Sequence, residues 1–397
     1  MTEKLYLEDS YIKEFDANVI ECIPYKDKYA VVLDKTAFYP EGGGQPSDTG
    51  YINDQKVIYV FEESKKILHI VNDKISTKKV TCRIDWNRRY DFMQQHTGQH
   101  VLSHCFLNLF NGNTDSFHLT DNSVSIEIDI KNFTDEDLTL LEDMANNIIY
   151  SNLPITSKIV NEEELKYLPL RKLPSVKDNI RIVSIGSIDH SPCGGTHVLR
   201  TGEVGIIKVI KWEKLKSSYR FHFLCGKRAL YDYRYKNSIQ QSLCAKLSVK
   251  NNDLEKTVNR IINENKNLNK EVLEKIKELI KYEASEKYNS CQPIKGFRII
   301  KEIYADRKFD DIKILAAELS SYEKTAALLG VTNENAQIVF CRSDDIDADM
   351  NVLLKNFIPL IDGKGGGSPK IALGGGKKEN LSFMIDEAYN SLVRSLS

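Results

Sequence analysis

The sequence predicts a multidomain α+β protein with a small N-terminal β-barrel, a central α+β domain, a helical hairpin and a C-terminal α/β domain. At 397 residues the chain exceeds the size of one typical domain. Short β-type runs give way to helical periodicity near residue 85, and a long stretch without proline or glycine separates two regions of mixed character. We therefore expect domains at residues 1–85, 86–225, 226–290 and 291–397.

The N-terminal region alternates short apolar runs with turns. Residues 18–23, 29–33, 55–61, 66–71 and 80–84 are rich in residues that favour strands, and glycine, aspartate and asparagine separate them. This pattern is typical of a small barrel or sandwich, and we predict the barrel.

The central region mixes helices and strands. Residues 88–110 have helical periodicity, and residues 124–130 alternate as a half-buried strand. Thr134 begins a second helix with a capping pattern, and this helix runs to about residue 152. Further strands are predicted at 180–185, 205–210 and 219–224.

The segment 226–290 is predicted to be helical, apart from a break at residues 248–253 that supplies an N-cap. After the break, apolar residues recur at spacings close to three and four, at Leu254, Val258, Ile261, Leu268, Val272, Ile276 and Leu279. Two interpretations fit this stripe equally well: a helical hairpin or short coiled coil that separates domains or mediates dimerisation, and a helix packed along its own domain.

The C-terminal region returns to α/β character. Strands are predicted at 297–300 and 337–340, and helices at 311–319 and 349–357. The glycine-rich segment 363–378 is predicted to be a loop before the final helix.

Composition and charge describe an ordinary globular protein. Hydrophobic residues make up 41% and charged residues 28%, and the net charge is −1. The first ten residues contain acids and no apolar core, and no apolar run is long enough to span a bilayer, so we expect a cytoplasmic protein. The spacing of the eight cysteines suggests no disulfide framework, which fits a reducing compartment.

Basic residues are locally concentrated although the net charge is near neutral. One cluster flanks Trp86 and Tyr90, and a second lies between residues 206 and 228. Such patches can follow the phosphates of a nucleic acid, and a solvated charged face explains either cluster equally well. The candidate phosphate contacts are Arg88, Arg89, Lys208, Lys211, Arg220, Lys364 and Lys370.

Four residues form a candidate metal site. His96 and His100 lie four apart on a predicted helix, so both imidazoles project from one face. Cys193 and His197 are also four apart, across two glycines that permit a tight loop. Together the two pairs provide a tetrahedral set of nitrogen and sulfur donors, which by ligand softness fits one Zn²⁺ per chain.

The chemistry of this site has alternatives. A structural zinc site usually has four protein ligands and no open coordination position. The mixed donors here, which join a helix to a glycine loop, favour a catalytic site whose fourth coordination position can open. A cysteine can also act as a nucleophile, but the pairing of Cys193 with His197 fits metal binding better. His104, four residues further along the helix, is interpreted as a supporting or core residue.

A third motif follows the second predicted strand. Residues 34–50 concentrate aromatic, acidic and amide groups on one loop, in which Gly42, Gly43 and Gly44 precede Gln45. The loop lacks the Gly-Lys-Ser/Thr ending of a phosphate-binding loop. It can bring backbone amides close to a ligand, and a flexible turn is the alternative interpretation.

Taken in their order along the chain, the glycine-rich loop, the histidine pair and the Cys193–His197 pair resemble motifs of one known module. This is the editing module of alanyl-tRNA synthetases and of its free-standing relatives, the AlaX proteins. The resemblance rests on residues 38–45, 96–100 and 193–197 and covers residues 1–225. The helical stretch and the glycine-rich segments at 363–376 look like the DHH-associated domain that ends these synthetases. The whole chain therefore resembles the long form of AlaX.

The resemblance implies a trans-editing deacylase for alanine tRNA mischarged with serine or glycine. An alanine-sized pocket rejects these amino acids poorly, so a second site must reward the serine hydroxyl. By resemblance, Thr36 makes this contact, supported by Gln45 and the glycines Gly42, Gly43 and Gly44. Water is expected to attack the ester, with zinc in a positioning role. With no aminoacylation domain before the barrel, charging of tRNA is not expected.

Two other functions fit parts of the sequence. A non-catalytic RNA-binding protein would carry the same residues around a structural zinc. A deacylase for mischarged threonine tRNA would share a similar zinc pattern, although the glycine-rich loop near residue 42 and the C-terminal region favour the alanine branch. A homodimer through the helical and C-terminal regions is a further expectation.

Overall fold

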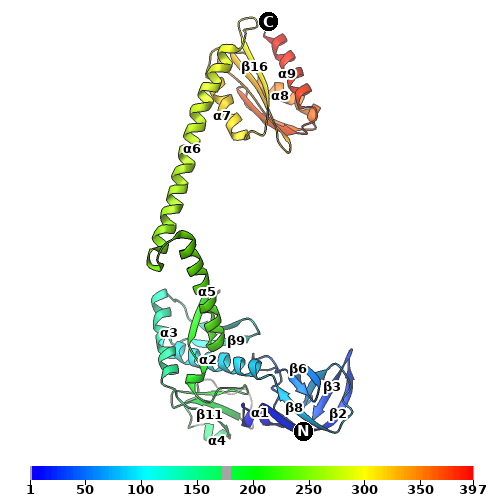
Figure 1. Ribbon diagram of the computed structural model, residues 1–397, viewed down its shortest axis with the longest axis vertical. Coiled ribbons are helices and arrows are strands. Elements are labelled where there is room, and N and C mark those ends of the chain that lie inside the picture. Colours follow the sequence, from blue (N-terminus) through cyan, green and yellow to red (C-terminus); the bar gives the residue numbers. More distant parts are fainter. Residues whose placement is uncertain (1, 166, 172–179, 397) are drawn as a thin grey trace. The chain divides into compact units, whose positions relative to one another are not determined.

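The computed structural model describes residues 2–165, 167–171 and 180–396 of the chain. The chain divides into two compact units, Met1–Leu243 and Cys244–Ser397, whose elements are labelled in Figure 1. Among the described residues, no helix combines the length and apolarity that a membrane crossing requires.

The N-terminal region is a closed barrel, so the barrel prediction is confirmed over the sandwich. Around the barrel the strands follow the order β2-β3-β7-β6-β5-β8. Their bounds are β2 (Glu14–Tyr25), β3 (Lys28–Leu33), β5 (Gly50–Ile52), β6 (Gln55–Glu63), β7 (Lys66–Val71) and β8 (Lys79–Ile84). Strand β8 alternates exposed and buried residues, which is the period-two pattern of a strand with one face in the core. A short segment outside the barrel pairs β1 (Glu3–Lys4) in parallel with β4 (Lys35–Thr36), and α1 (Leu5–Glu8) follows β1.

The central region is built around helix α2 (Trp86–Phe110). Asp85 caps this helix, because its side chain accepts from the amide of Arg88. Helix α3 (Asp135–Tyr150) begins with the predicted capping box of Thr134 and Asp137. Apolar residues of α2, such as Leu102 and Phe106, join the core that the neighbouring strands form.

Two antiparallel sheets surround these helices. The first has the order β14-β15-β10-β9 and the second the order β11-β12-β13. The strands are β9 (Asn113–Leu119), β10 (Val124–Asp129), β11 (Ile155–Val160), β12 (Ile180–Ile185), β13 (Asp189–Pro192), β14 (Ile207–Lys214) and β15 (Tyr219–Cys225), with short helices α4 (Glu162–Leu165) and η1 (Thr201–Val204). The sequence pattern had not predicted β9, β11 or β13, which are mostly polar or short.

The long helical segment is broken where the sequence predicts a break. Helix α5 (Gly226–Leu247) ends before η2 (Asn251–Asp253), and α6 (Leu254–Ser290) follows. Near its C-terminal end α6 buries Ile280 and Ala284 in a core shared with α7. Most of the apolar stripe further towards the start of α6 is exposed, so within its own unit this helix is packed only in part.

The second unit carries a sheet of order β16-β17-β18-β20-β19, in which β16 and β17 are parallel. Its elements are β16 (Arg298–Ala305), α7 (Phe309–Leu319), β17 (Thr325–Thr332), β18 (Ala336–Arg342), α8 (Met350–Phe357), η3 (Ile358–Ile361), β19 (Lys364–Gly367), β20 (Ile371–Gly376) and α9 (Leu381–Ser395). The prediction of a loop at residues 363–378 is therefore wrong, because β19 and β20 form a hairpin there. Glycine allows the close packing, since a Cβ on Gly374 would lie 2.4 Å from Cδ1 of Ile358.

Candidate metal centre

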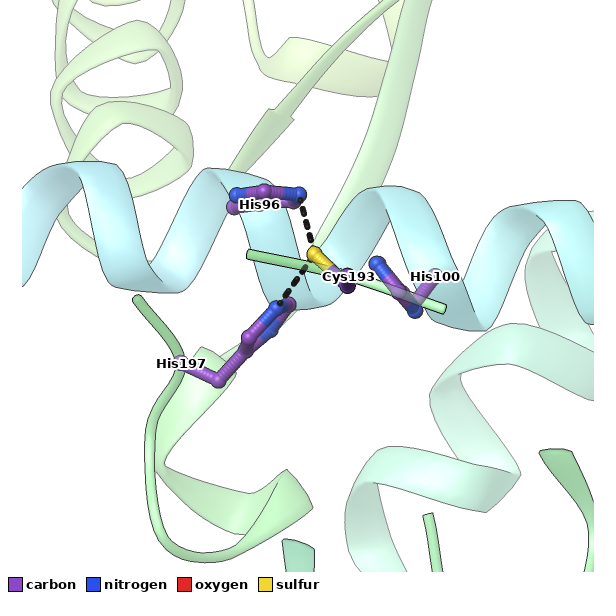
Figure 2. Close-up of side chains that lie close together, drawn as sticks. All are labelled: His96, His100, Cys193 and His197. Carbon is purple, nitrogen blue, oxygen red and sulfur yellow. Dashed lines mark hydrogen bonds between the residues drawn. The ribbon is translucent and has the colours of Figure 1, made fainter. Parts of the chain in front are cut away.

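The four predicted donor residues converge at one point (Figure 2). His96 and His100 come from consecutive turns of α2, and Cys193 and His197 come from the loop after β13. Each offers a ligand atom, and these atoms all lie within 4.8 Å of one another. The thiol Sγ lies 3.4 Å from Nε2 of His96 and 3.2 Å from Nε2 of His197.

The loop that carries Cys193 is held in place from two sides. Nη1 of Arg181 donates to the carbonyls of Cys193 (3.0 Å) and Gly195 (2.9 Å), while its Nε donates to the carbonyl of Leu7 (3.2 Å). Gly195 itself packs against the ring of His96, where a Cβ would lie 2.2 Å from Cε1. The absence of a side chain at this glycine therefore lets the loop approach α2.

The second ring nitrogen of each histidine faces a polar group of the protein. Nδ1 of His96 lies 2.7 Å from Oε1 of Gln45, and Nδ1 of His197 lies 3.1 Å from the hydroxyl of Thr97. Nδ1 of His100 is 3.7 Å from Oδ2 of Asp189, and it has no hydrogen-bond partner among the residues described. Partners of this kind fix the ring orientation of metal-binding histidines.

The amide of Gln45 is oriented by Thr196. The backbone amide of Thr196 donates to Oε1 of Gln45 (3.3 Å), and Nε2 of Gln45 donates to the Thr196 hydroxyl (2.8 Å). Oε1 is thus the atom that faces His96, so Nδ1 of His96 carries the proton. This tautomer leaves Nε2 of His96 with a free lone pair directed at Cys193.

The electrostatics of the cluster favour the metal-binding protonation states. Burial alone would raise the pKa of Cys193, but His96, His197 and His100 together hold it well below its usual range. Burial lowers the pKa of His197 to about 3, so this imidazole is neutral. Burial alone would lower the pKa of His100, but Asp189 and Cys193 raise it. Metal binding requires a thiolate and neutral imidazoles, and the buried nitrogen and sulfur atoms of the four residues supply that donor set once His100 is deprotonated.

Asp189 carries a negative charge beside the cluster. Burial opposes this charge, yet His100 and Arg171 hold the pKa of Asp189 well below its usual range. Nε of Arg171 donates to Oδ1 of Asp189 at 2.8 Å, and Asp189 also accepts from the hydroxyl of Ser191. Asp189, Thr97 and Arg181 were missed in the sequence, because nothing in the local pattern indicates a partner that only the tertiary fold brings near.

A cavity of about 700 Å³ lies beside the donor cluster. Its wall includes the donors His96, His100 and Cys193, together with Gly42 and Gly43 of the glycine-rich loop. Gly44 lies behind this surface with φ of +81°, where a Cβ would lie 2.5 Å from the carbonyl of Phe117. The loop therefore forms one wall of the cavity, as its sequence pattern indicated.

Thr36 and Gln45 were expected to act together, but the structure separates their contacts. Gln45 is 1% exposed and contacts His96 and Thr196. Thr36 of β4 is fully buried, 2.8 Å from Nε2 of His69 on the barrel strand β7, and is not among the residues that line the cavity. Gln45 is thus a positioning residue for a metal donor in this geometry.

The basic residues lie in different environments. Arg89 is fully buried, where it pairs with Asp48 and donates to the carbonyls of Ser10 and Ala37. The prediction that Arg89 contacts a phosphate is therefore wrong, because its guanidinium is buried and paired inside the protein. Arg88 is partly exposed and pairs with Asp121. The remaining candidates are more exposed surface residues, namely Lys208, Lys211, Arg220, Lys364 and Lys370.

Comparison with protein families matches both halves of the first unit. The family described as class II (A) tRNA synthetases matches residues 10–88. The family described as the threonyl and alanyl tRNA synthetase second additional domain matches residues 180–221, which include Cys193 and His197. Both matches place these two segments in the class of tRNA synthetase-related domains.

Full-length relatives identify the branch within this class. The chain is 34% identical over 394 residues to the alanyl-tRNA editing protein AlaX-L of Pyrococcus horikoshii, covering 94% of each chain. It is 30% identical over 377 residues to the alanyl-tRNA editing protein Aarsd1 of Rattus norvegicus, covering 90% of each. The chain belongs to the family of alanyl-tRNA editing proteins.

Two further likenesses concern the synthetases. The chain is 32% identical over 410 residues to the alanine–tRNA ligase of Pyrococcus abyssi, covering all of this chain and 44% of the ligase. The C-Ala domain of Aquifex aeolicus alanyl-tRNA synthetase aligns with 27% of this chain at 20% identity. Its TM-score of 0.25 is too low to establish a shared fold.

Proposed function

We propose that this chain is a cytoplasmic, trans-acting deacylase that hydrolyses the ester between serine, or glycine, and the terminal adenosine of alanine tRNA. The main support for this proposal is that four donor side chains converge beside a cavity of about 700 Å³ in a member of the alanyl-tRNA editing family. The lining of this cavity includes residues from all three segments on which the sequence resemblance rests.

We infer that the metal is Zn²⁺. Imidazole nitrogen and thiolate sulfur are both usual zinc ligands, and four of them make a tetrahedral site. With ordinary zinc bond lengths, neighbouring donors of a tetrahedral site are about 3.3–3.6 Å apart. The 3.4 Å separation between the Cys193 sulfur and Nε2 of His96 lies within this range, and the 3.2 Å separation to Nε2 of His197 lies just below it. A bound zinc ion would hold the substrate's amino or carbonyl group, or polarise a water.

Thr36 is our candidate for the contact with serine. Nδ1 of His69 faces the carbonyl of Val31 (2.9 Å), which only accepts, so Nδ1 carries the proton. Burial lowers the pKa of His69 to about 4, so the ring is neutral and its Nε2 is an acceptor. The Thr36 hydroxyl must then donate to His69, and its oxygen accepts from the amide of Phe38 (3.1 Å).

This arrangement supports a selective role for the hydroxyl. Its proton is committed to His69, so the remaining lone pair of Thr36 can only accept a hydrogen bond. Serine has a hydroxyl that can donate one, whereas alanine has none. Because Thr36 has no exposed surface and does not line the cavity, this contact requires the protein to rearrange when the substrate binds.

A deacylation assay with matched substrates tests the proposal. The metal-loaded chain should release serine from Ser-tRNA(Ala) much faster than alanine from Ala-tRNA(Ala), with Gly-tRNA(Ala) run in parallel. Equal decay of all three at the rate of buffer alone would contradict the proposed deacylation of alanine tRNA. Preference for Ser-tRNA(Thr) over Ser-tRNA(Ala) would favour the threonine-type deacylase instead.

A further inference from the structure

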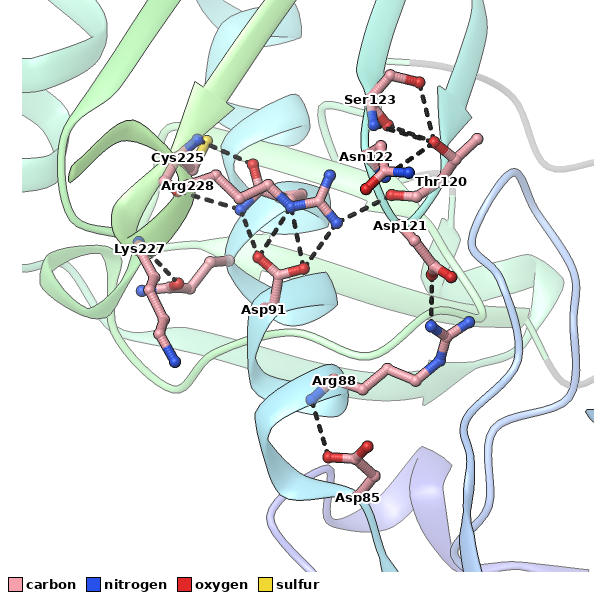
Figure 3. Close-up of polar contacts among 12 residues, drawn as sticks. Asp85, Arg88, Asp91, Thr120, Asp121, Asn122, Ser123, Cys225, Lys227 and Arg228 are labelled. Atoms are coloured by element: carbon pink, nitrogen blue, oxygen red, sulfur yellow. Dashed lines mark hydrogen bonds and ion pairs between the residues drawn. The ribbon is translucent and has the colours of Figure 1, made fainter. Parts of the chain in front are cut away.

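A second cavity of about 310 Å³ lies where α5 begins, and the hydrolysis described above does not use it. Its wall includes Arg88, Lys227 and Arg228, together with the aromatic residues Phe92 and Tyr231. Figure 3 shows the two arginines of this α5 pocket with their acidic partners. The buried ring of Phe92 lies between the guanidiniums, with centroid distances of 4.5 Å to Arg88 and 5.9 Å to Arg228.

Arg228 has donor capacity that its partners do not use. Its Nε and Nη2 hold the carboxylate of Asp91 at 2.6–3.0 Å, and Nη2 also donates to the carbonyl of Thr120 (2.9 Å). Its Nη1 is buried and has no hydrogen-bond partner within the described part of the chain. A buried donor of this kind is unfavourable unless an acceptor arrives.

The position of the charges at the helix start adds to this argument. Lys227 and Arg228 occupy the first turn of α5, where the helix dipole disfavours cations and favours anions. The ammonium of Lys227 lies 5.8 Å from the ring of Tyr231, and that ring is 53% exposed. Cations beside an exposed aromatic ring are the combination by which proteins bind single-stranded nucleic acid.

An intermediate hollow connects this pocket with the metal-site cavity. The hollow, of about 550 Å³, shares Glu41 and Gly42 with the metal-site cavity and Arg88 and Asp121 with the α5 pocket. All three depressions lie within the first compact unit. The three depressions are therefore neighbours along the glycine-rich loop, and the ion pair of Arg88 and Asp121 lies between the hollow and the α5 pocket.

We propose that the α5 pocket binds a nucleotide of the single-stranded 3′ end of the RNA, upstream of the terminal adenosine. Lys227 and Arg228 contact its phosphate, and Tyr231 stacks on its base. This inference rests on the proposed function for the identity of the RNA, and it adds a binding subsite to the site of hydrolysis.

Binding of an uncharged oligonucleotide tests the subsite without any hydrolysis. The probe is a fluorescent single-stranded RNA with the 3′-terminal sequence of alanine tRNA, followed by anisotropy at several salt concentrations. Lys227→Glu should weaken binding about fivefold or more and lower the salt slope by about 0.7, the value of one lost phosphate contact. Tyr231→Ala should weaken binding about fivefold or more with an unchanged slope, because stacking is not ionic.

Lys236→Glu is the matched control, since it makes the same charge change on the exposed surface of α5 outside the pocket. It should bind the probe like the unmodified chain. Glutamate in the first turn of a helix is favourable, so Lys227→Glu should not lower the unfolding temperature, and lost binding then reports the contact.

Affinities of Lys227→Glu and Tyr231→Ala equal to that of Lys236→Glu would overturn the subsite. The two proposals also fail separately. If the chain hydrolyses no aminoacyl-tRNA but the probe follows the predicted pattern, the deacylase proposal fails and the RNA subsite stands. If Ser-tRNA(Ala) is hydrolysed but the probe ignores both substitutions, the subsite alone is wrong.

Discussion

Buried histidines occur in two regions of the first unit, and their surroundings differ. In the metal centre, His96 and His197 each have Nδ1 next to a protein group and Nε2 next to the Cys193 sulfur. In the barrel, His69 has both nitrogens satisfied, by the carbonyl of Val31 and the hydroxyl of Thr36. Burial keeps the rings of His69 and His197 neutral, with pKa values of about 4 and 3.

The difference shows that burial and neutrality do not by themselves make a histidine a ligand. What distinguishes His96 and His197 is that the protein holds one nitrogen of each ring while the other nitrogen faces the Cys193 sulfur. Substitutions can test this distinction, and the effects on bound metal should decrease in the following order.

Removal of a donor should have the largest effect. His96→Ala removes one of four ligands, so we expect bound zinc, measured by elemental analysis after dialysis, to fall to a small fraction of one per chain. His69→Leu is the matched change in the barrel and should retain the metal. Full retention of zinc by the His96 variant would refute the ligand assignment.

Two neighbouring glycines in the loop that carries Cys193 allow a more specific comparison of substitutions. A Cβ on Gly195 would lie 2.2 Å from Cε1 of His96, whereas a Cβ on Gly194 would meet nothing within 4 Å. Gly195→Ala should therefore displace His96 and weaken zinc binding by about tenfold or more, an effect like that of losing an orienting partner. Gly194→Ala should bind zinc normally in a competition titration with a chelator. Equal affinities would show that the loop yields without moving the ring.

The orienting amide should have a smaller effect. Gln45→Ala leaves all four donors but removes the acceptor that fixes the tautomer and ring plane of His96. Loss of such a partner typically costs 10–100-fold in metal affinity, and we expect the lower part of this range because all four donors remain. The same chelator titration measures it, and an unchanged affinity would return Gln45 to the role in serine recognition that the sequence suggested.

Thr36→Val should leave zinc binding unchanged, because Thr36 contacts His69 rather than a donor. We expect its effect in selectivity, where hydrolysis of Ser-tRNA(Ala) should slow by about two- to tenfold, the value of one neutral hydrogen bond. The ratio of serine to alanine release is the measurement. An unchanged ratio with normal zinc would remove Thr36 from substrate recognition.

The donor set could be predicted from the sequence because helix and loop geometry turn a spacing of four into a shared direction. The barrel and the capping box of Thr134 were also predictable, since both depend on local patterns. The role of Gln45 was not, because its amide contacts His96 and Thr196, which lie far away in the sequence.

Two of the sequence predictions, for Arg89 and for the glycine-rich segment, were wrong for the same physical reason. Arg89 stands beside Arg88 in a basic cluster, and only the fold shows that one is enclosed with Asp48 while the other reaches the surface. The glycines at 364–376 have low strand propensity, yet they form β19 and β20 because the close approach of η3 excludes side chains. In both cases tertiary packing overrides a local preference.

The hydrogen bond between Gln45 and His96 joins the barrel to the helix that carries half of the donors. If a metal ion binds the four donors, its binding is linked thermodynamically to the association of these two parts. Ions that bind only the assembled state stabilise the barrel and the central region as one cooperative block. By the same linkage, any fluctuation that separates the glycine-rich loop from α2 weakens the binding of the ion. Removal of the ion by a chelator makes such fluctuations more frequent.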